Sequence, residues 1–428
     1  EAQVREKHRL FERRVREFGL GEADLRQTVP SPASVGFLGR TEFRFFLRGG
    51  PRLGLSQTGS PVPLSITRCE LHPDACHNAF DALLAAVRSD PEVQVFDERT
   101  GRGWLCGVVL RAAARPSDER REVLMTLVTT AIATAPSEPL RRLAAAVSER
   151  CPDVAGVVWS PSGGEQHVDR APGWRSAVTQ RQQLLCGRGF LLQHICGERL
   201  QAAPEAFFRP NLLLATAISQ AAIEFSDVGP EDTVWDAFCG QGSLSLLLAR
   251  RCRRIVALDR SEAALDTLQA NFAAQGLASR AVVARVDLGN AAELRAMVGV
   301  PDGLVAGGTS PAFKMSEDDE CEEEAGDGNA GGDEEGGSSS IGGRIPAEGV
   351  PLPDVIVADP GRNGMPKAFR RFICKLDART IVLIGAGRPL LKDCAVISKR
   401  GYELTSLLPF DSHPHTTRLE VVAHLQRP

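Results

Sequence analysis

Two aspartates on either side of a glycine turn are the residues best placed to do chemistry in this chain. Asp236 ends an apolar run, the turn Gly240-Gln241-Gly242 follows it, and Asp259 ends the next apolar run. Glycines at such a turn let backbone amides approach a ligand, and an acid on the next strand can accept hydrogen bonds from ribose hydroxyls. The pattern predicts a site for a nucleoside-type cofactor, although Asp236 could instead cap the following helix.

Phe238 and Asp287 extend the same candidate site. Phe238 lies between Asp236 and the glycine turn, and Asp287 follows a third apolar run, where its carboxylate could meet an adenine edge. Aspartate also commonly starts a turn, which is the purely structural alternative for Asp287. Both residues are therefore expected cofactor contacts, and the turn remains open for Asp287.

Alternating strands and helices from Pro204 onward must position these residues. The last two strands follow each other with no helix between them, as in the terminal hairpin of a class I methyltransferase. The expected fold over residues 204–428 is therefore α/β, with a Rossmann-like, seven-stranded, doubly wound sheet that binds ligands at the carboxyl ends of its strands. Seven strands in this order favour S-adenosylmethionine over NAD as the cofactor. The strands are expected at Thr233–Phe238, Arg254–Asp259, Ala281–Val286, Asp354–Asp359, Thr380–Ile384, Glu403–Pro409 and Leu419–Leu425.

Residues 1–203 predict a separate N-terminal part, made of a helix and a central mixed α/β domain. The charged stretch Glu1–Phe18 has apolar residues at helical spacing. The segments Phe43–Leu47 and Leu53–Leu55 are joined through Gly49-Gly50, which is typical of a β-hairpin, and helical stretches follow. We expect the central domain to bind RNA.

Charge is unevenly distributed along the chain. The formal net charge is -4, but residues 317–335 hold eleven acids and no base, so the other residues carry a net charge of +7. A net basic, arginine-rich body suits contact with phosphate. The acidic tract, residues 303–349, lacks the apolar content to form a core and is expected to be a disordered surface insert. An alternative is that it mimics phosphate and competes for the basic surface.

Three further motifs carry a resemblance to the RNA (uracil-5-)-methyltransferase family over nearly the whole chain. Residues 204–211, Pro-Glu-Ala-Phe-Phe-Arg-Pro-Asn, resemble the family signature Ser-Phe-Phe-Gln-x-Asn. Residues 359–362, Asp-Pro-Gly-Arg, are similar to Asp-Pro-Pro-Arg, and residues 414–420 match the element Pro-His-Thr-x-x-x-Glu. Matches of this length in this order are specific.

The resemblance implies a chemistry for these residues. In the family, a cysteine thiolate adds to C6 of a uracil flipped out of RNA, C5 attacks the methyl group of S-adenosylmethionine, and a glutamate removes the C5 proton. By position, Glu420 matches this general base, Asp359 the acid that positions the uracil, and Arg362 the arginine after it. Glu420 could instead pair with a neighbour such as Arg418 or Arg362. The family's cofactor positions match Asp236, Gly240, Gly242 and Asp259.

The chain departs from the family at three places. The family's nucleophile stands in Ser-Cys-Asn at the end of a strand, where this chain has Ala386 by one alignment and Gly385 by another. Neither residue carries a thiol. The glutamine that would face the cofactor or the base is Arg209, and the second proline of Asp-Pro-Pro-Arg is Gly361, which should loosen the turn.

The expected function is therefore that of a catalytically degenerate RNA-binding protein with a methyltransferase fold. Neither Cys394 nor Cys239 is expected to replace the nucleophile, so uracil methylation should be lost, whereas S-adenosylmethionine binding could be kept or lost. We favour a role in rRNA maturation or ribosome assembly, with ribosomal RNA preferred over transfer RNA and ribosome-assembly proteins as further partners. The alternative is an active S-adenosylmethionine-dependent tRNA or rRNA uracil-5-methyltransferase.

The sequence also limits which other ligands and compartments are expected. Cys69, His72, Cys76 and His77 have the residue types of a zinc site without the spacing of a common zinc finger, so we expect them in the core and expect no metal. No apolar run reaches membrane-spanning length. By analogy with degenerate modification enzymes, a mitochondrial location is expected, with the cytoplasm as the alternative.

Overall fold

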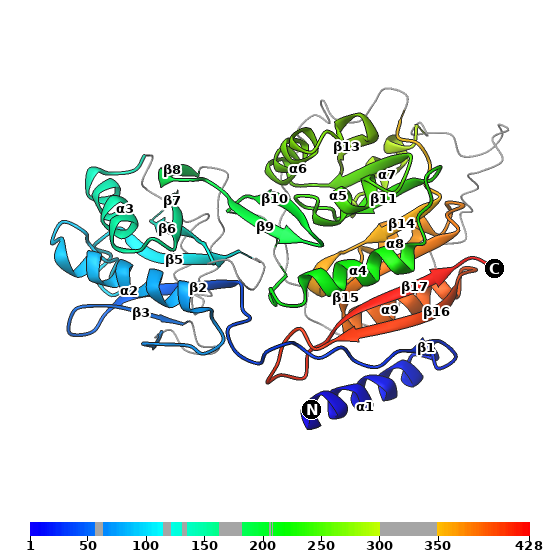
Figure 1. Cartoon of the computed structure of the whole chain (residues 1–428), viewed down its shortest axis with the longest axis horizontal. Coiled ribbons are helices and arrows are strands. Elements are labelled where there is room, and N and C mark those ends of the chain that lie inside the picture. The colour runs from blue at the N-terminus through cyan, green and yellow to red at the C-terminus, as the bar shows by residue number, and fades with distance from the viewer. Residues whose placement is uncertain are drawn as a thin grey trace.

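The structure, a computed structural model, describes residues 1–55, 63–113, 121–130, 135–161, 182–204, 207, 209–299 and 349–428. This part of the chain forms a C-terminal unit on an eight-stranded sheet and an N-terminal unit on a seven-stranded sheet, with a two-stranded hairpin between them (Figure 1). Apart from its last residue, the predicted acidic insert at 303–349 lies outside the described residues.

The C-terminal sheet confirms the predicted doubly wound fold, although it has eight strands and not seven, because Asp24–Leu25 from the N-terminal part pairs with its edge. Its strand order is β13-β12-β11-β14-β15-β17-β16-β1, and all neighbours are parallel except β17, which runs antiparallel to β15 and β16. The order reverses between β11 and β14, so the connections after these strands diverge and leave room for a ligand. The strands are β1 (Asp24–Leu25), β11 (Thr233–Ala237), β12 (Arg254–Asp259), β13 (Ala281–Arg285), β14 (Val355–Ala358), β15 (Thr380–Ala386), β16 (Glu403–Phe410) and β17 (Glu420–Gln426).

Two buried apolar clusters, one on each face of this sheet, hold the helices in place. Alternate residues of a strand point to opposite faces, and Trp235 accordingly belongs to one cluster and Val234 to the other. Helices α1, α7, α8 and α9 pack on the Trp235 face, and α4, α5 and α6 on the Val234 face. Among the described helices, none combines the length and apolar character needed to cross a bilayer. The helices are α1 (Ala2–Glu17), α4 (Ala215–Ser226), α5 (Ser243–Ala249), α6 (Glu262–Ala274), α7 (Ala291–Met297), α8 (Lys367–Ile373) and α9 (Gly387–Ser398).

Helix α1 packs on the C-terminal unit, although its place in the sequence grouped it with the N-terminal part. Phe11 and Val15 are buried in the Trp235-side cluster. Lys7 forms a buried ion pair with Asp411, and its Nζ donates a second hydrogen bond of 3.0 Å to the carbonyl oxygen of His413. Asp411 and His413 lie in the connection between β16 and β17, so α1 fixes the loop that leads into Glu420.

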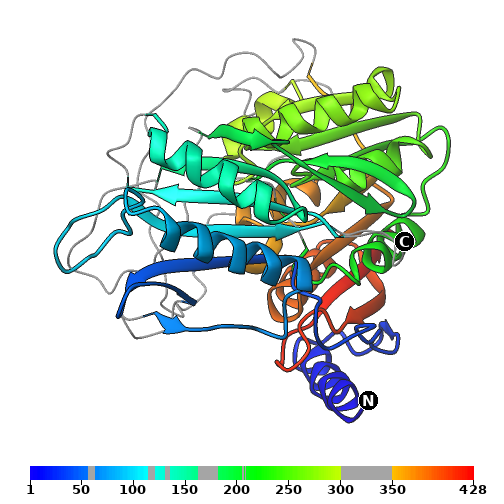
Figure 2. The same ribbon diagram turned by 60° about the vertical axis from the view of Figure 1, so that its left-hand side comes forward.

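The N-terminal unit contains the predicted hairpin and helices. Strands β2 and β3 pair through a tight turn in which Leu47 opposes Pro51 and both Gly49 and Gly50 have positive φ. Helices α2 (Asp74–Ser89) and α3 (Glu138–Arg150) pack on one face of the sheet (Figure 2). The strand order is β4-β3-β2-β5-β6-β7-β8. The strands are β2 (Arg40–Leu47), β3 (Pro51–Leu55), β4 (Leu64–Ser65), β5 (Leu105–Ala112), β6 (Val123–Thr129), β7 (Val154–Pro161) and β8 (Gln183–Gly187).

A hairpin of β9 (Leu191–Ile195) and β10 (Glu198–Ala202) links the two units. The side chain of Asn271, on α6, bonds to the backbone of Gln201 twice: Oδ1 accepts from the N–H at 2.8 Å, and Nδ2 donates to the carbonyl oxygen at 2.9 Å. Asn271 Nδ2 also lies 3.4 Å from the carbonyl oxygen of Gln241. One buried amide therefore ties the hairpin to the glycine turn after β11.

Candidate functional site

The turn after β11 contains three residues in the left-handed backbone region: Phe238 (φ 60°), Gly240 (φ 54°) and Gly242 (φ 86°). A phenylalanine in this region is strained, and its ring packs edge-on against Phe369 at 5.4 Å between ring centroids. At Gly242 an added Cβ would lie 1.9 Å from Leu268 Cδ1, so both the backbone angle and the available space require glycine.

Asp259 holds this turn through its carboxylate. Its Oδ2 accepts a hydrogen bond from the backbone N–H of Gly240 at 2.9 Å, and its Oδ1 accepts one from Ser261 at 2.8 Å. Each carboxylate oxygen can accept a further bond, so Asp259 can still meet ribose hydroxyls as predicted.

Asp236 and Gln241 each present a buried oxygen without a hydrogen-bond partner among the described residues. Ser245 donates to Asp236 Oδ2 at 2.5 Å, while Asp236 Oδ1 and Gln241 Oε1 have no donor. Burial raises the pKa of Asp236 to about 7, and the charges of Asp359 and Asp259 add to this rise although the Ser245 hydrogen bond opposes it. Unsatisfied buried acceptors are costly, which indicates that a ligand with donor groups completes them.

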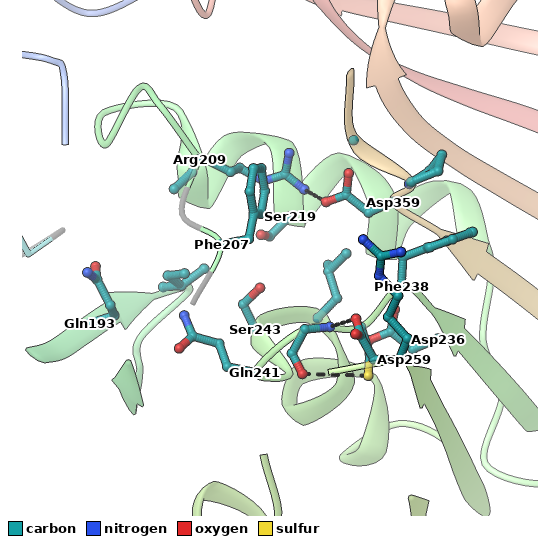
Figure 3. A pocket seen from close by; sticks show the side chains of 18 of the residues that line it. Gln193, Phe207, Arg209, Ser219, Asp236, Phe238, Gln241, Ser243, Asp259 and Asp359 are labelled. Atoms are coloured by element: carbon teal, nitrogen blue, oxygen red, sulfur yellow. Dashed lines mark hydrogen bonds and ion pairs between the residues drawn. The ribbon is translucent and has the colours of Figure 1, made fainter. Parts of the chain in front are cut away.

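Both residues line a cavity of about 370 Å³ between the hairpin and the C-terminal sheet (Figure 3). This volume lies within the range of about 300–1,000 Å³ that is typical of small-molecule sites. Gln193 and Ile195 of β9 contribute to one side, and the turns after β11, β12 and β14 contribute Phe238, Asp259 and other residues. The polar lining residues include Gln193, Arg209, Ser219, Asp236, Gln241, Ser243, Asp259, Arg260 and Asp359.

Arg209 closes the cavity on the side of Glu420. Its guanidinium donates to Asp359 Oδ2 at 2.7 Å and forms a second ion pair with Glu420, and all three side chains are largely buried. Burial raises the pKa of Glu420 above its ordinary value, and the positive charge of Arg209 opposes this rise. Arg209 and Asp359 line the cavity and Glu420 does not, so Glu420 adjoins the lining of the cavity through its ion pair with Arg209.

Ala386 is the cross-strand partner of Glu420 in the antiparallel pair of β15 and β17. Side chains of directly opposed residues lie on the same side of a sheet, so the position that the resemblance assigns to a nucleophile does adjoin the predicted base. Gly385, the other candidate for this position, faces away from Ala386 along the same strand, and an added Cβ there would lie 3.6 Å from the carbonyl oxygen of Gly361.

The two cysteines considered as substitutes are both buried thiols. Cys394 lies within α9, and burial raises its pKa well above its ordinary value. Cys239 lines the cavity, but burial and the nearby charges of Asp236 and Asp259 also raise its pKa well above the ordinary value. Both side chains are therefore thiols and not thiolates near neutral pH, and a thiol is a poor nucleophile.

Two predicted site residues lie away from the cavity. Asp287 is exposed, and its Oδ1 accepts a hydrogen bond from the backbone N–H of Gly289 at 2.8 Å, which is the turn geometry given above as its alternative role. Arg362 is exposed and does not line the cavity, and it makes no ion pair with a described residue. The structure thus brings together Asp236, Phe238, Gly240, Asp259, Arg209 and Asp359 around one cavity, with Gly242 and Glu420 just behind it.

Gly361 occupies a conformation that the family's proline could not adopt. Its φ is 77°, whereas proline is restricted to about -65°, so the turn after β14 has a different backbone path and is not merely a looser version. The preceding residue, Pro360, has φ -73° and ψ 2°, a region that is also disfavoured before proline.

We expect Gly361→Pro to lower the free energy of unfolding by about 1–3 kcal/mol, because proline cannot satisfy the positive φ. Chemical denaturation measures the loss. Gly361→Ala is the control, with a smaller loss because alanine is strained but not excluded there. A proline variant as stable as the unchanged protein would contradict this backbone assignment.

Three members of the predicted cysteine and histidine group, His72, Cys76 and His77, are buried in the N-terminal unit, whereas Cys69 is partly exposed and lies outside its core. His72 is buried, bonds to Thr41 and packs edge-on against Phe43 and His77. Burial lowers the pKa of His72 to about 4. Within the described residues, no group of three or more His, Cys, Asp or Glu side chains is arranged to hold a metal ion.

Gln241 and Gln193 were not identified as site residues from the sequence. Gln241 stands between the two glycines of the turn, so its position was a usable signal. Gln193 lies on β9, before the predicted domain boundary at 203, and reaches the cavity in a hairpin that Asn271 ties to the C-terminal unit. No local sequence pattern predicts that Gln193 lines the cavity.

Comparison with known proteins confirms the resemblance noted in the sequence. No family model matches the chain. It is 23% identical over 448 residues to a protein of Chlorobaculum tepidum named as an uncharacterized RNA methyltransferase, covering 100% of this chain and 79% of that protein. It is 22% identical over 400 residues to a protein of Chlamydia trachomatis named in the same way, covering 91% of this chain and 84% of that protein. Among solved structures, the tRNA (uracil-54, C5)-methyltransferase of Pyrococcus abyssi in complex with S-adenosyl-L-homocysteine superposes with a TM-score of 0.66 at 17% identity, covering 99% of this chain and 83% of that one. The chain is thus a homologue of RNA methyltransferases and has the fold of that tRNA methyltransferase.

Proposed function

We propose that this homologue of RNA methyltransferases is an RNA-binding protein that keeps the S-adenosylmethionine site and has lost covalent methylation of uracil C5. The observation that carries the proposal is the position of Arg209, which forms ion pairs with both Asp359 and Glu420. These are the two carboxylates that the family resemblance assigns to holding and deprotonating a uracil.

The donor and acceptor pattern of the cavity supports cofactor binding. Asp236 Oδ1 and Gln241 Oε1 would accept hydrogen bonds from the amino group of the cofactor, and Asp259 from its ribose hydroxyls. When bound, S-adenosylmethionine supplies a methyl group activated by its sulfonium. The relative from Pyrococcus abyssi holds S-adenosyl-L-homocysteine, which is the demethylated form of that cofactor.

The same region argues against the covalent route. To contact Asp359 and Glu420, a uracil would have to displace Arg209 from both ion pairs. Separating buried charges that are paired with each other is costly. No thiolate would meet the uracil, because Ala386 and Gly385 lack sulfur and the pKa values of Cys239 and Cys394 are raised. Loss of a nucleophile commonly costs several powers of ten in rate.

A degenerate modification enzyme that still holds RNA could act as a placeholder in ribosomal RNA maturation, and we place this role in the mitochondrion by analogy. The net charge of +7 outside residues 317–335 supports contact with RNA. A second candidate is an active RNA methyltransferase that acts on a base needing no covalent step. It is favoured by the direct contact of Asp359 with the cofactor cavity.

Two measurements separate these functions. Calorimetric titration with S-adenosylmethionine is expected to show binding, and incubation with labelled S-adenosylmethionine and either ribosomal or transfer RNA is expected to show no methyl transfer. Stoichiometric methylation at uracil C5 would refute the proposal. Methylation at another atom would establish the second candidate, and absence of cofactor binding would reduce the function to that of an RNA-binding scaffold.

We expect Asp236→Asn to weaken binding of S-adenosylmethionine by about ten- to a hundredfold, because a hydrogen bond to a charged group contributes about 1.5–3 kcal/mol. The same change should raise the melting temperature of the ligand-free protein at pH 8. Burial raises the pKa of Asp236 from 3.8 to about 7, so the folded state retains a proton that the unfolded state has lost, and stability falls as pH rises through this window.

Asparagine carries no titrating proton, so the gain in melting temperature should be smaller at pH 5, which lies inside the window between the two pKa values, and should disappear only below pH 3.8, where Asp236 is neutral in both states. Ser245→Ala serves as the matched control, because it removes the partner of Oδ2 and leaves Oδ1 in place. Cofactor affinity that is unchanged in Asp236→Asn would show that the orphaned oxygen does not meet the ligand.

A further inference from the structure

Three exposed arginines stand beside the cavity, two of them in turns or loops and one at the start of a helix, and we refer to Arg362, Arg388 and Arg418 as the arginine rim. Arg362 lies in the 3-10 turn η3 (Gly361–Asn363) after β14, Arg388 in the first turn of α9, and Arg418 in the loop before β17. None of them forms an ion pair with any residue that the structure describes. All three charges are therefore available to a partner.

Backbone contacts bring Arg388 and Arg418 together. The N–H of Gly387 donates a hydrogen bond of 3.2 Å to the carbonyl oxygen of Leu419. Arg388 directly follows Gly387 and Arg418 directly precedes Leu419, so the two arginines leave the backbone on either side of a single hydrogen bond.

Arg362 joins the same group through the adjacent turn. The carbonyl oxygen of Gly361 lies 3.6 Å from the Cβ position of Gly385, two residues before Gly387 in the chain. Burial lowers the pKa of His413, and the charges of both Arg418 and Arg362 contribute to that decrease. The imidazole of His413 therefore lies close enough to both Arg418 and Arg362 to be affected by their charges.

The segments that form the rim carry no acid to cancel this charge. Residues 361–364, 386–389 and 413–418 contain three arginines and two histidines but no aspartate or glutamate. Carboxylates close to these segments are already paired: Asp359 and Glu420 with Arg209, and Asp393, which lies beside Gly364, with Arg370. The rim is therefore a positively charged surface directly beside the cavity, since Gly361 lines the cavity and precedes Arg362.

We propose that the arginine rim binds backbone phosphates of a single-stranded RNA segment that crosses the mouth of the cavity. The inference rests on the proposed RNA-binding function and adds where the backbone lies. Guanidinium groups match phosphate geometry through paired hydrogen bonds. Phe207 lines the same cavity with 59% of its surface exposed, so an aromatic face is available for stacking a base. Cations that track a backbone beside an aromatic platform are typical of single-strand binding and favour RNA over an acidic protein.

The test compares a rim variant, Arg362→Gln with Arg388→Gln and Arg418→Gln, with a control variant of equal charge change. The control carries Arg251→Gln, Arg254→Gln and Lys399→Gln. These three residues are exposed and lie at the end of the sheet opposite the cavity, where β12 begins and α9 ends. Binding of a short single-stranded oligouridylate is measured by fluorescence anisotropy over a series of KCl concentrations, and equal melting temperatures show that both variants fold.

For the rim variant, the slope of log affinity against log salt should be smaller by about 2, because each lost phosphate contact removes about 0.7 from single-strand binding. The control should keep the slope of the unchanged protein. An equal decrease in both variants, or none in the rim variant, would refute the rim as the phosphate site. So would rim-dependent binding of poly-glutamate without rim-dependent binding of RNA. If the unchanged protein binds no RNA at all, the proposed function itself fails.

Discussion

A protein that carries Ala386→Cys and Arg209→Gln together is expected to methylate uracil C5 at about a thousand times the background of the unchanged protein or more, because restoring a nucleophile recovers several powers of ten in rate. Ala386 opposes Glu420 across the strand pair, so the new thiol would lie beside the predicted base. The glutamine frees Glu420 and Asp359 from the guanidinium that occupies them. Transfer of labelled methyl from S-adenosylmethionine to ribosomal and transfer RNA measures the gain.

Three further variants show whether the thiol and the freed carboxylates act as argued. Ala386→Ser with Arg209→Gln has a similar size without a thiolate and should stay inactive. Ala386→Cys alone should stay inactive as well, because Arg209 still blocks Glu420. Gly385→Cys with Arg209→Gln tests the other alignment, and a Cβ atom at this position makes an ordinary van der Waals contact, 3.6 Å from the carbonyl oxygen of Gly361. If neither cysteine pair transfers methyl while binding cofactor and RNA, the lost activity has another cause.

Arg209→Leu is expected to lower the free energy of unfolding by about 3–5 kcal/mol at pH 8, since it leaves two buried carboxylates without a counter-charge. The loss should shrink at pH 5. Burial already raises the pKa of Glu420, and removal of Arg209 takes away a group that lowers it. The folded state then binds a proton more tightly than the unfolded state does, so stability falls as pH rises. Urea denaturation at the two pH values measures the effect.

The partner variant Glu420→Gln shows whether repulsion is the cause. Alone it leaves the pair of Arg209 and Asp359 intact and should cost less than Arg209→Leu. Added to Arg209→Leu it should recover part of the lost stability, which gives a coupling energy for the pair. Recovery of nothing would mean that Arg209 stabilises the site by packing and not by charge.

The strands of the C-terminal sheet could be predicted because their apolar runs are local signals. Arg254–Asp259 is the strand β12 as predicted, whereas the strand predicted at Thr380–Ile384 continues to Ala386 in β15. The extension arises because β17 supplies a hydrogen-bonding partner through Gly385 and Ala386, and this pairing is absent from the local sequence. Glycine weakens a strand by propensity, and tertiary pairing overrides that preference here.

The candidate site could be predicted where a residue ends an apolar run or lies in the turn directly after it. Asp259 and the glycine turn after β11 are of this kind, and Gly240, Gln241 and Asp259 line the cavity. The partner of Glu420 is not, because the nearby Arg418 and Arg362 were the arginines that the sequence suggested. The actual partner, Arg209, is 211 residues away and reaches Glu420 only once the sheet is assembled. A long-range ion pair of this kind has no periodicity that a single sequence can reveal.

The pairing of Lys7 with Asp411 has a consequence for how the polypeptide matures during translation. The two residues are 404 positions apart, so at about 5–20 residues per second Lys7 leaves the peptidyl-transferase centre roughly 20–80 seconds before its counter-ion is made. For most of that interval the apolar side of α1, with Phe11 and Val15, lacks α9, the late-translated helix against which it packs. Prematurely terminated products would keep this side uncovered, which gives chaperones and proteases a means to tell finished molecules from fragments.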